Sequence, residues 1–484
     1  MLPRPELTAG DARGGRPAAG VAAAALAAGL AAAAVAGETP RALALDRAIA
    51  EALQYNLSLA QGAVNVRSRT LGVEQAKAAF DLTGGPLVRA GSPDGETEWT
   101  YGLQGSKRFG GGTELAVAGT VTEGGASDPG GGGALTVDLA QPLFRRFGRS
   151  VAQEPVFAAD DQLRGERRRW EEQKSDLVLE LVVLFETIVR LDAQVVFEKA
   201  YASRLERLAA LGRVRERQGR SSRADVLRID VQRGESEARL AGAIERRGIA
   251  SRELADLLGA DPDVPIAPEP PPDLVLDIPP SDLAVAAAFS NRMDFAQACD
   301  DASVARRQGA LARRYRWPDV TLNVSMRRDD GESFDRAVSE GDTQWFVLAS
   351  SEGSPWRRAD RLVMAQAAAA EESAGLALEV RRRLIARRVL QAIAECRRTA
   401  AELDIAARNR QLAEDRSRLS RRLYVIGRGD SFSVSDAEGQ QADAENRLFE
   451  ARSAARLAQY ALLHAMGALI EHPRELAAGP EDLP

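Results

Sequence analysis

Apolar and polar residues alternate along this chain in two rhythms, one typical of helices and one typical of strands. Residues 43–80 carry apolar side chains at every third or fourth position, which predicts one helix over this range, followed by a break at Gly84-Gly85-Pro86. Beyond this break, apolar residues occupy every second position in three short stretches. We expect strands there, each with one apolar face, over 99–103, 114–121 and 135–139.

A much longer helical pattern follows the predicted strands and continues from 151 to 217. One helix of that length would extend about 100 Å at 1.5 Å per residue, which no compact domain accommodates. Gly219 interrupts the pattern, Ser221 or Ser222 can cap a following helix, and helical spacing resumes over 226–258. We therefore expect a long helical hairpin with a tight turn at Gly219.

The second half of the chain repeats this order of elements. The pattern predicts a helix over 283–314, strands over 320–326 and 344–350, a long helix after Pro355, a turn at Gly427 and a last helix over 432–469. Each half therefore reads as helix, strands, long helix, turn and helix.

The two halves also match in sequence. Residues 205–260 lie over residues 413–468 without a gap, at the offset of 208 residues that separates Gly219 from Gly427. A unit of this size is too long for a stacked array of short repeats. The match indicates that the chain arose by duplication.

The offset between the halves is larger near their beginnings. It is 236 residues between Asp46 and Asp282 in the first helices, and 213 residues between Pro142 and Pro355 after the strands. Most of the difference in length between the halves therefore lies between the first helix and this proline.

These patterns divide the chain into five segments. We expect a signal peptide over 1–36, a first structural repeat over 37–260, a Pro-rich linker over 261–280, a second structural repeat over 281–470 and a C-terminal tail over 471–484.

The signal peptide is indicated by an Ala-rich apolar run that follows Arg13 and Arg16. Ala34-Val35-Ala36 fits a small-residue cleavage site. A weak membrane anchor or an Ala-rich leader without structure would carry the same composition. After the leader, no stretch approaches 18 consecutive apolar residues, so we expect no membrane-spanning helix.

Composition excludes several classes of function. The net charge of −6, with Arg residues interleaved among Asp and Glu, gives no electrostatic reason to expect a nucleic-acid partner. His464 and His472 lack a spaced metal partner, and Cys299 and Cys396 have no paired metal or redox spacing around them. We expect no enzymatic activity, no cofactor and no metal site, and we interpret both cysteines as small buried apolar residues.

Several segments at the joints of this pattern resemble the TolC-like outer-membrane efflux channel family. The matching segments cover essentially the whole chain from about residue 41 to 470 and are LALDRAIAEALQYNLSL (43–59), QPLFRRFG (141–148), QGRSSRADVL (218–227), LADLLGA (254–260) and YVIGRGDSFSVSDAE (424–438).

The resemblance implies a mainly α fold with β, in which a duplicated unit of helix, strands and long helical hairpin forms a homotrimer. Each chain would give four strands to one shared outer-membrane β-barrel in contact with lipid, and helices to an α-barrel tunnel through the periplasm. The implied function is an exit duct of a tripartite efflux or type I secretion system, which passively conducts substrates from an inner-membrane pump and a periplasmic adaptor protein. The alternating pattern predicts five strands, one more than the four per chain that the resemblance implies.

The resemblance also implies a periplasmic gate at the turns far from the membrane. The family's pair of gate acids falls on Ser433 and Asp436, so only the second acid is kept, and the gate tyrosine falls on Tyr424. The position of a gate arginine is taken by Gly429, and Asp225 is the acid of the first copy. Asp225 and Asp436 can equally be acids of a first helical turn, favoured by the helix dipole.

The two turns would meet the adaptor protein, according to the same resemblance. The residues concerned are Gly219 with Arg220 and Gly427 with Arg428. Glycine is expected at any tight turn between helices, so it does not by itself indicate docking. A periplasmic coiled-coil scaffold without a pore is the alternative function, and it predicts helices uninterrupted by strands.

Overall fold

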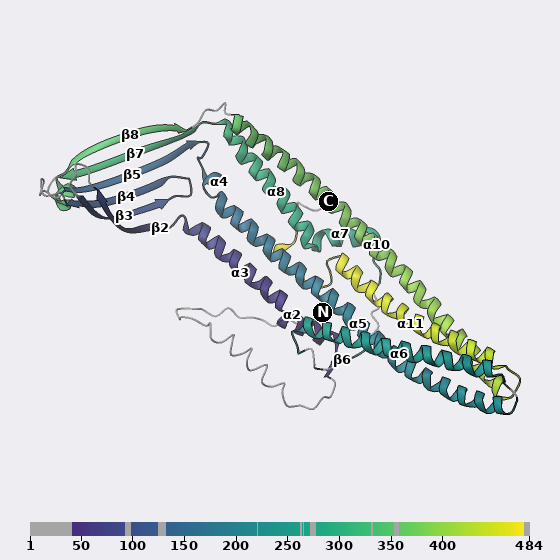
Figure 1. The fold of residues 1–484 in the computed structure, drawn as a ribbon. Helices are drawn as coiled ribbons and strands as arrows, with labels where there is room; N and C mark the ends of the chain where they lie inside the picture. The colour runs from purple at the N-terminus through teal and green to yellow at the C-terminus, as the bar shows by residue number, and fades with distance from the viewer. Residues whose placement is uncertain are drawn as a thin grey trace.

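The computed structural model describes residues 41–91, 98–123, 132–219, 221–261, 264, 266–271, 277–330, 333–352 and 358–478. The predicted signal peptide over 1–36, Arg220 and Pro355 lie outside these residues. The molecule is elongated, with a sheet at one end and helices that run from it to two hairpin tips at the other end (Figure 1).

Helices make up most of the length of the molecule. Their bounds are α2 (Leu45–Tyr55), α3 (Leu57–Ala78), α4 (Arg149–Ala152), α5 (Glu154–Arg217), α6 (Arg223–Leu258), α7 (Ser281–Asn291), α8 (Met293–Arg313), α9 (Phe334–Ser339), α10 (Arg358–Val425) and α11 (Ser431–Ala465). The two predicted hairpins are present as α5 with α6 and α10 with α11. Among the described residues, none of these helices is both long and apolar enough to span a membrane.

Six strands form one antiparallel sheet. In spatial order they are β2 (Leu82–Gly91), β3 (Glu98–Arg108), β4 (Glu114–Glu123), β5 (Gly132–Phe144), β7 (Asp319–Asp330) and β8 (Asp342–Glu352). A separate parallel pair, β1 (Arg41–Leu43) with β6 (Ile266–Pro268), joins the start of the described chain to the predicted Pro-rich linker.

The strand register gathers apolar side chains on one face of the sheet. Tyr101 of β3 lies between Val88 of β2 and Val121 of β4, and all three side chains are exposed. In β3 and β4 the opposite face is polar, as where the hydroxyls of Thr100 and Thr122 lie 3.2 Å apart, whereas β8 exposes Phe346 and Leu348 on that side. The predicted alternation with one apolar face is therefore confirmed for the three stretches of the first half.

Strand β2 was not predicted, and the interpretation of Gly84-Gly85-Pro86 as a break between the first helix and the strands is wrong. These residues lie within β2, which pairs with β3 over its full length. Glycine and proline weaken a strand, but an edge strand tolerates them because Pro86 removes only a single ladder donor. Short helix α9, between β7 and β8, was also not predicted.

The expected single helices over 43–80 and 283–314 are each broken in two. Asn56 is extended (ψ 126°), and its side chain accepts hydrogen bonds from the amides of Ser58 and Leu59, which caps α3. Arg292, at the equivalent position of the second half, is also extended (ψ 125°) and separates α7 from α8. Apolar spacing alone did not reveal either break, because it continues across both.

Each break anchors the end of the hairpin helix that returns to it. The Asn56 side chain donates to the carbonyl of Leu257 (3.0 Å), and the Arg292 guanidinium donates to the carbonyl of Ala465 (3.2 Å). Leu257 and Ala465 are separated by the 208-residue offset of the repeat. The two halves therefore make the same contact with different side chains, which supports duplication at the level of the fold.

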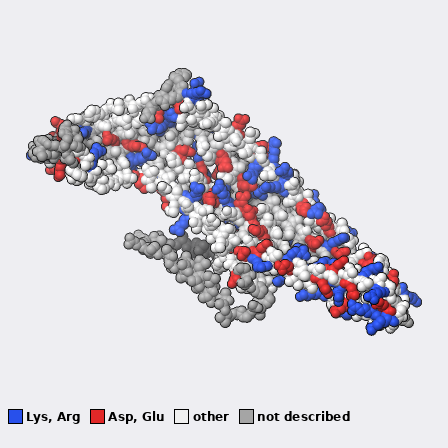
Figure 2. Space-filling model, in the orientation of Figure 1, with Lys and Arg blue, Asp and Glu red and all other residues white. Residues whose placement is uncertain are grey.

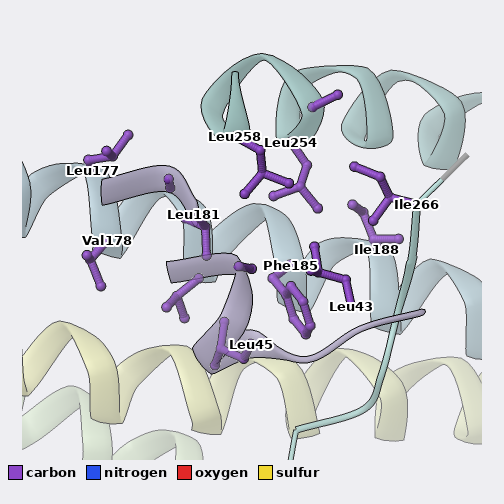
Figure 3. Packing of buried hydrophobic residues seen from close by; sticks show 14 of the residues in the cluster. Leu43, Leu45, Leu177, Val178, Leu181, Phe185, Ile188, Leu254, Leu258 and Ile266 are labelled. Carbon is purple, nitrogen blue, oxygen red and sulfur yellow. The ribbon is translucent and has the colours of Figure 1, made fainter. Parts of the chain in front are cut away.

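Two equivalent cores surround these contacts. The first packs Leu43, the α5 face containing Phe185, and Leu254 of α6, and all three side chains are fully buried (Figure 3). The second contains Ile385 of α10 and Leu462 of α11, both fully buried. Leu254 and Leu462 occupy matching positions of the repeat, so each half buries its own returning helix.

A buried carboxylate of α5 forms hydrogen bonds with helices of both hairpins. Glu198 of α5 is fully buried and accepts hydrogen bonds from Ser236 (2.8 Å) and Arg239 (3.0 Å) of α6 and from Asn446 (3.1 Å) of α11. Because a buried charge requires partners to offset its desolvation, this cluster fixes the relative position of three helices.

Replacing Gly259, which ends α6, tests whether the contact between the end of α6 and the break at Asn56 requires glycine. Gly259 has φ +64°, and an added Cβ would lie 2.7 Å from the Tyr55 carbonyl oxygen. We expect Gly259→Ala to lower the free energy of unfolding by about 1–3 kcal/mol, because Ala is strained at this φ and has no space. Thermal unfolding of the purified protein measures the change.

Gly248 within α6 provides the matched control, because an added Cβ there meets open space. Gly248→Ala should leave stability unchanged or raise it by up to about 1 kcal/mol through helix propensity. Equal melting temperatures for the two variants would show that the end of α6 does not require glycine at position 259.

Candidate functional site at the hairpin tips

The two hairpins turn at glycines with left-handed backbones. Gly219 has φ +70° and Gly427 has φ +78°, and an added Cβ would meet open space at both positions. Backbone conformation, not crowding, therefore requires glycine at the tips. At the second turn the amide of Arg428 donates to the carbonyl of Leu423 (2.9 Å), which closes the end of α10.

The helices that leave the turns begin with mirrored caps. In α6, Ser222 is the N-cap and forms a reciprocal capping box with Asp225: the Ser222 hydroxyl accepts from the Asp225 amide, and the Asp225 carboxylate accepts from the Ser222 amide (3.1 Å). In α11, Asp430 is the N-cap and accepts from the Ser433 amide (2.9 Å). The hydroxyl and the carboxylate have thus exchanged places between equivalent positions.

Both cap carboxylates are held in the ionised state. Hydrogen bonds from Ser222 lower the pKa of Asp225, and the Ser431 hydroxyl and Arg228 act in the same direction against partial desolvation. Hydrogen bonds from the Ser433 side chain and amide lower the pKa of Asp430, although the negative charge of Asp225 opposes this shift. That opposition indicates that the first turns of α6 and α11 lie near each other.

Tyr424 links the two tips. Its side chain is buried at the end of α10, and the guanidinium carbon of Arg215 lies 4.0 Å from the ring centroid. The same guanidinium donates to the carbonyls of Tyr424 (2.7 Å) and Val425 (3.3 Å). Arg215 therefore joins the last turn of α5 to the last turn of α10 by stacking and hydrogen bonding.

Asp436 is paired within the chain. Its carboxylate accepts from Arg416 of α10 at 2.6 Å and from Gln440 at 3.2 Å. The pair is partly exposed, so we expect it to contribute at most about 1 kcal/mol to stability. Its larger effect is electrostatic, because Arg416 offsets the negative charge of Asp436 within the chain.

The predicted site residues therefore fall into two groups. Asp225, Ser433 and Tyr424 lie at the tips, whereas Asp436 lies further along α11 against α10. Gly219, Gly427 and the exposed Arg428 form the turns, and Arg220 lies outside the described residues.

Sequence reasoning missed three residues that hold these groups in place. Arg215 and Arg416 are two of the many Arg residues interleaved among Asp and Glu, and no spacing rule pairs either with its partner on another helix. Asp430 did carry a signal, because it stands 208 residues after Ser222, one of the two predicted caps of α6. The repeat register could have identified it as a cap.

Charge is distributed unevenly along the molecule. Figure 2 shows that Arg, Lys, Asp and Glu side chains crowd the hairpin tips, whereas the sheet end is mostly uncharged. The tips also expose apolar side chains, including Val425 (67% exposed), Ile426 (64%) and Phe432 (53%). One end of the molecule is thus suited to an apolar environment, and the other to an aqueous one with apolar contact points.

Solved structures with the same architecture decide the fold. No protein-family model and no curated protein sequence matches the chain. The outer-membrane channel OprN superposes with a TM-score of 0.69 at 17% identity, over 88% of this chain and 90% of that one. The outer-membrane protein VceC of Vibrio cholerae gives 0.67 at 18% identity, over 87% and 96%.

The MtrE outer-membrane channel of Neisseria gonorrhoeae, in its open state, gives a TM-score of 0.67 at 16% identity, over 88% of this chain and 89% of that one. The chain has the fold of the TolC family. The resemblance found in the sequence is therefore confirmed for the fold. In this TolC fold, the hairpin tips are the end of the helical part furthest from the sheet (Figure 1).

The caps predict that the tips respond to pH. Because the folded-state pKa of Asp430 is depressed, its stabilising effect is present above the unfolded pKa of about 3.9 and is lost as pH falls through the folded value. Protection of the Ser433 amide from hydrogen exchange should therefore stay constant between about pH 6 and about pH 5 and decrease as the pH falls below about 4.

Two variants separate titration from capping. Asp430→Asn keeps an acceptor oxygen, so protection should persist at low pH, whereas Asp430→Ala should lose about 1 kcal/mol of protection at every pH. Hydrogen exchange read by mass spectrometry and corrected for intrinsic rates distinguishes them. An Asn variant with the pH response of the unmodified protein would refute the assignment.

Proposed function

We propose that this chain forms, as a homotrimer, an outer-membrane exit duct that passively conducts substrates of a tripartite efflux or type I secretion system. The observation that carries the proposal is the union, in one chain, of an exposed apolar sheet face with two very long helical hairpins. The described neighbours OprN and MtrE are outer-membrane channels, which supports the same function for this fold.

The sheet has the properties of a wall that faces lipid. Its strands contain 10 to 13 residues, and a strand that crosses a bilayer needs about 9 to 11. Its apolar face is exposed in the single chain, and its first and last strands each leave one edge without a partner among the described residues. Closure of three sheets into one β-barrel would pair the backbone N–H and C=O groups of those edges and place the apolar faces in lipid.

The hairpins would extend the duct through the periplasm. Helix α5 contains 64 residues, which corresponds to about 96 Å. In this assignment residues 37–260 and 281–470 are the two structural repeats, residues 261–280 join them, and residues 471–484 form a tail. Residues 1–36 would direct export and be removed.

The tips would form the periplasmic gate, with Asp225, Tyr424, Ser433 and Asp436 at or near its narrowest part. In a trimer these residues would repeat around the duct. The Arg215–Tyr424 contact would hold the two hairpins of one chain together in the closed state, and separation of the hairpins would open the passage. The Arg416–Asp436 pair would limit the cation preference of the opening.

The turns would also be the docking points for a periplasmic adaptor, which in turn would bind an inner-membrane pump. Gly219 with Arg220 and Gly427 with Arg428 are the proposed docking residues, and the exposed apolar residues Val425 and Ile426 directly precede Gly427. Such a patch, rimmed by charged side chains, is typical of a surface that binds another protein. A pore-free scaffold is less consistent with the chain, because it offers no reason for the apolar sheet.

Conductance measurements in planar bilayers test whether the chain forms a duct and whether Arg416 and Asp436 set its ion selectivity. Arg416→Ala should raise the cation-to-anion permeability ratio, and Asp436→Ala should lower it, each by about fivefold at most, because an exposed charge contributes about 1 kcal/mol or less. Asp415→Ala removes a nearby exposed acid that pairs with Arg418 (3.3 Å) and serves as the control. Well-folded trimers that never conduct would refute the duct.

The proposed latch gives a separate prediction. Arg215→Ala should increase the ratio of open to closed states by about tenfold or more, since a hydrogen bond to a charged group contributes about 1.5–3 kcal/mol. Arg215→Lys keeps the charge but not the planar fork, so it should also open more often. Arg217→Ala changes an exposed Arg one half-turn away and should gate normally; identical gating in all four proteins would exclude the latch.

A further inference from the structure

The helices next to the sheet continue into strands one by one. Helix α3 leads into β2, and β5 leads through α4 into α5. Helix α8 leads into β7, and β8 leads into α10. Four helices therefore correspond to four strands, whereas the sheet contains six.

The helices lie side by side in the order of these four strands (Figure 1). Trp170 of α5 donates to the carbonyl of Leu59 in α3 (3.0 Å), Arg307 of α8 pairs with Glu154 of α5 (3.2 Å), and Arg313 of α8 pairs with Glu371 of α10 (3.1 Å). Strands β5, β7 and β8 follow the same order without a gap. Only β2 and β5, which continue from adjacent helices, are kept apart, and β3 and β4 lie between them.

The lengths of the two halves agree with an inserted hairpin. The offset between the halves falls from 236 at Asp46 to 213 at Pro142, a difference of 23 residues. Strands β3 and β4 occupy Glu98–Arg108 and Glu114–Glu123, within the same interval. Among the described residues, the second half has two strands at this place, β7 and β8, with the short helix α9 between them. Sequence and structure thus assign the extra length to one β-hairpin.

The hairpin is built like the rest of the wall. Its strands contain 11 and 10 residues, enough to cross a bilayer. Tyr101 and Leu103 of β3 and Val117 and Val121 of β4 are exposed and lie on the same face as the apolar residues of β2 and β5. A hairpin that folded across the polar face would have no reason to carry this pattern.

The turn of the hairpin is fixed at the joint between sheet and helices. The Gly148 amide donates to the carbonyl of Gly111 (3.1 Å), and the Thr113 hydroxyl donates to the Gln141 side chain (2.5 Å). A hollow of about 360 Å³, lined by Arg108, Glu114 and Arg146 among others, opens beside this turn. The helices therefore leave space under the inserted strands.

The outer edges of the six-stranded sheet are suited to each other. Successive strands alternate in direction, so β8 of one chain would run antiparallel to β2 of the next. They contain 11 and 10 residues. Strand β8 exposes Trp345, Phe346, Val347 and Leu348 in succession, and such an edge is prone to uncontrolled pairing unless a partner covers it.

We propose that all six strands enter the wall, so that three chains close a barrel of eighteen strands instead of the twelve that four strands per chain would give. The inference rests on the trimeric duct proposed above. Barrel diameter grows roughly linearly with strand number, so the bore through the outer membrane would be about 1.5-fold wider than a twelve-stranded one. The duct would then flare where its helical tunnel meets the barrel.

Electron cryo-microscopy of the full-length trimer in lipid nanodiscs tests this count. Eighteen strands in the wall, with β8 of each chain beside β2 of the next, is the expected result. Twelve wall strands, with β3 and β4 outside the closed barrel, would overturn the inference and leave the duct intact. Absence of a membrane-inserted trimer would refute the duct and the inference together.

Single cysteines give an independent readout of the hairpin. In a protein whose buried Cys299 and Cys396 are replaced by Ala, Thr122→Cys on the polar face should react with a water-soluble maleimide. Val121→Cys, its neighbour on the apolar face, should react at least tenfold more slowly in nanodiscs and become reactive on denaturation. Equal reactivity of the two native-state variants would show that β4 is not part of the wall.

Discussion

The course of the chain depends on four glycines that adopt left-handed backbones. Gly219 and Gly427 reverse helices of 64 and 68 residues, and Gly259 and Gly467 end the returning helices against the breaks at Asn56 and Arg292. Side chains with a Cβ are strained at these φ values. Without these reversals, the apolar faces of each hairpin could not be buried against each other, and the tips would not meet.

The order of elements could be predicted from the sequence because long helices repeat their apolar spacing many times. The hairpins follow from that spacing, and five of the six strands of the sheet follow from apolar residues at every second position. Strand β2 could not be predicted in this way, because Gly84-Gly85-Pro86 have a turn propensity that pairing with β3 overrides. The pairing of β1 with β6 joins three-residue strands that are far apart in sequence, and no local pattern specifies such a contact.

The candidate site was predictable only in part. Turn glycines and cap residues are local signals, so Gly219, Gly427 and Asp225 could be identified from their neighbours in sequence. The contacts of Arg215 with Tyr424 and of Arg416 with Asp436 join different helices, and a chain with sixty arginines offers many equivalent partners. Their selection depends on how the hairpins pack, which the sequence does not state position by position.

The mirrored caps show how duplicated halves diverge without loss of structure. A helix start needs one side-chain acceptor at the N-cap, and either a hydroxyl or a carboxylate provides it. Ser222 with Asp225 can therefore become Asp430 with Ser433 through an intermediate that has two serines or two aspartates, and no step leaves the helix uncapped. The negative charge nevertheless moves by three residues, almost one helical turn. Around a threefold axis, the caps of α6 and α11 would therefore place their carboxylates at two different heights along the axis. Two identical caps would place all the carboxylates at the same height.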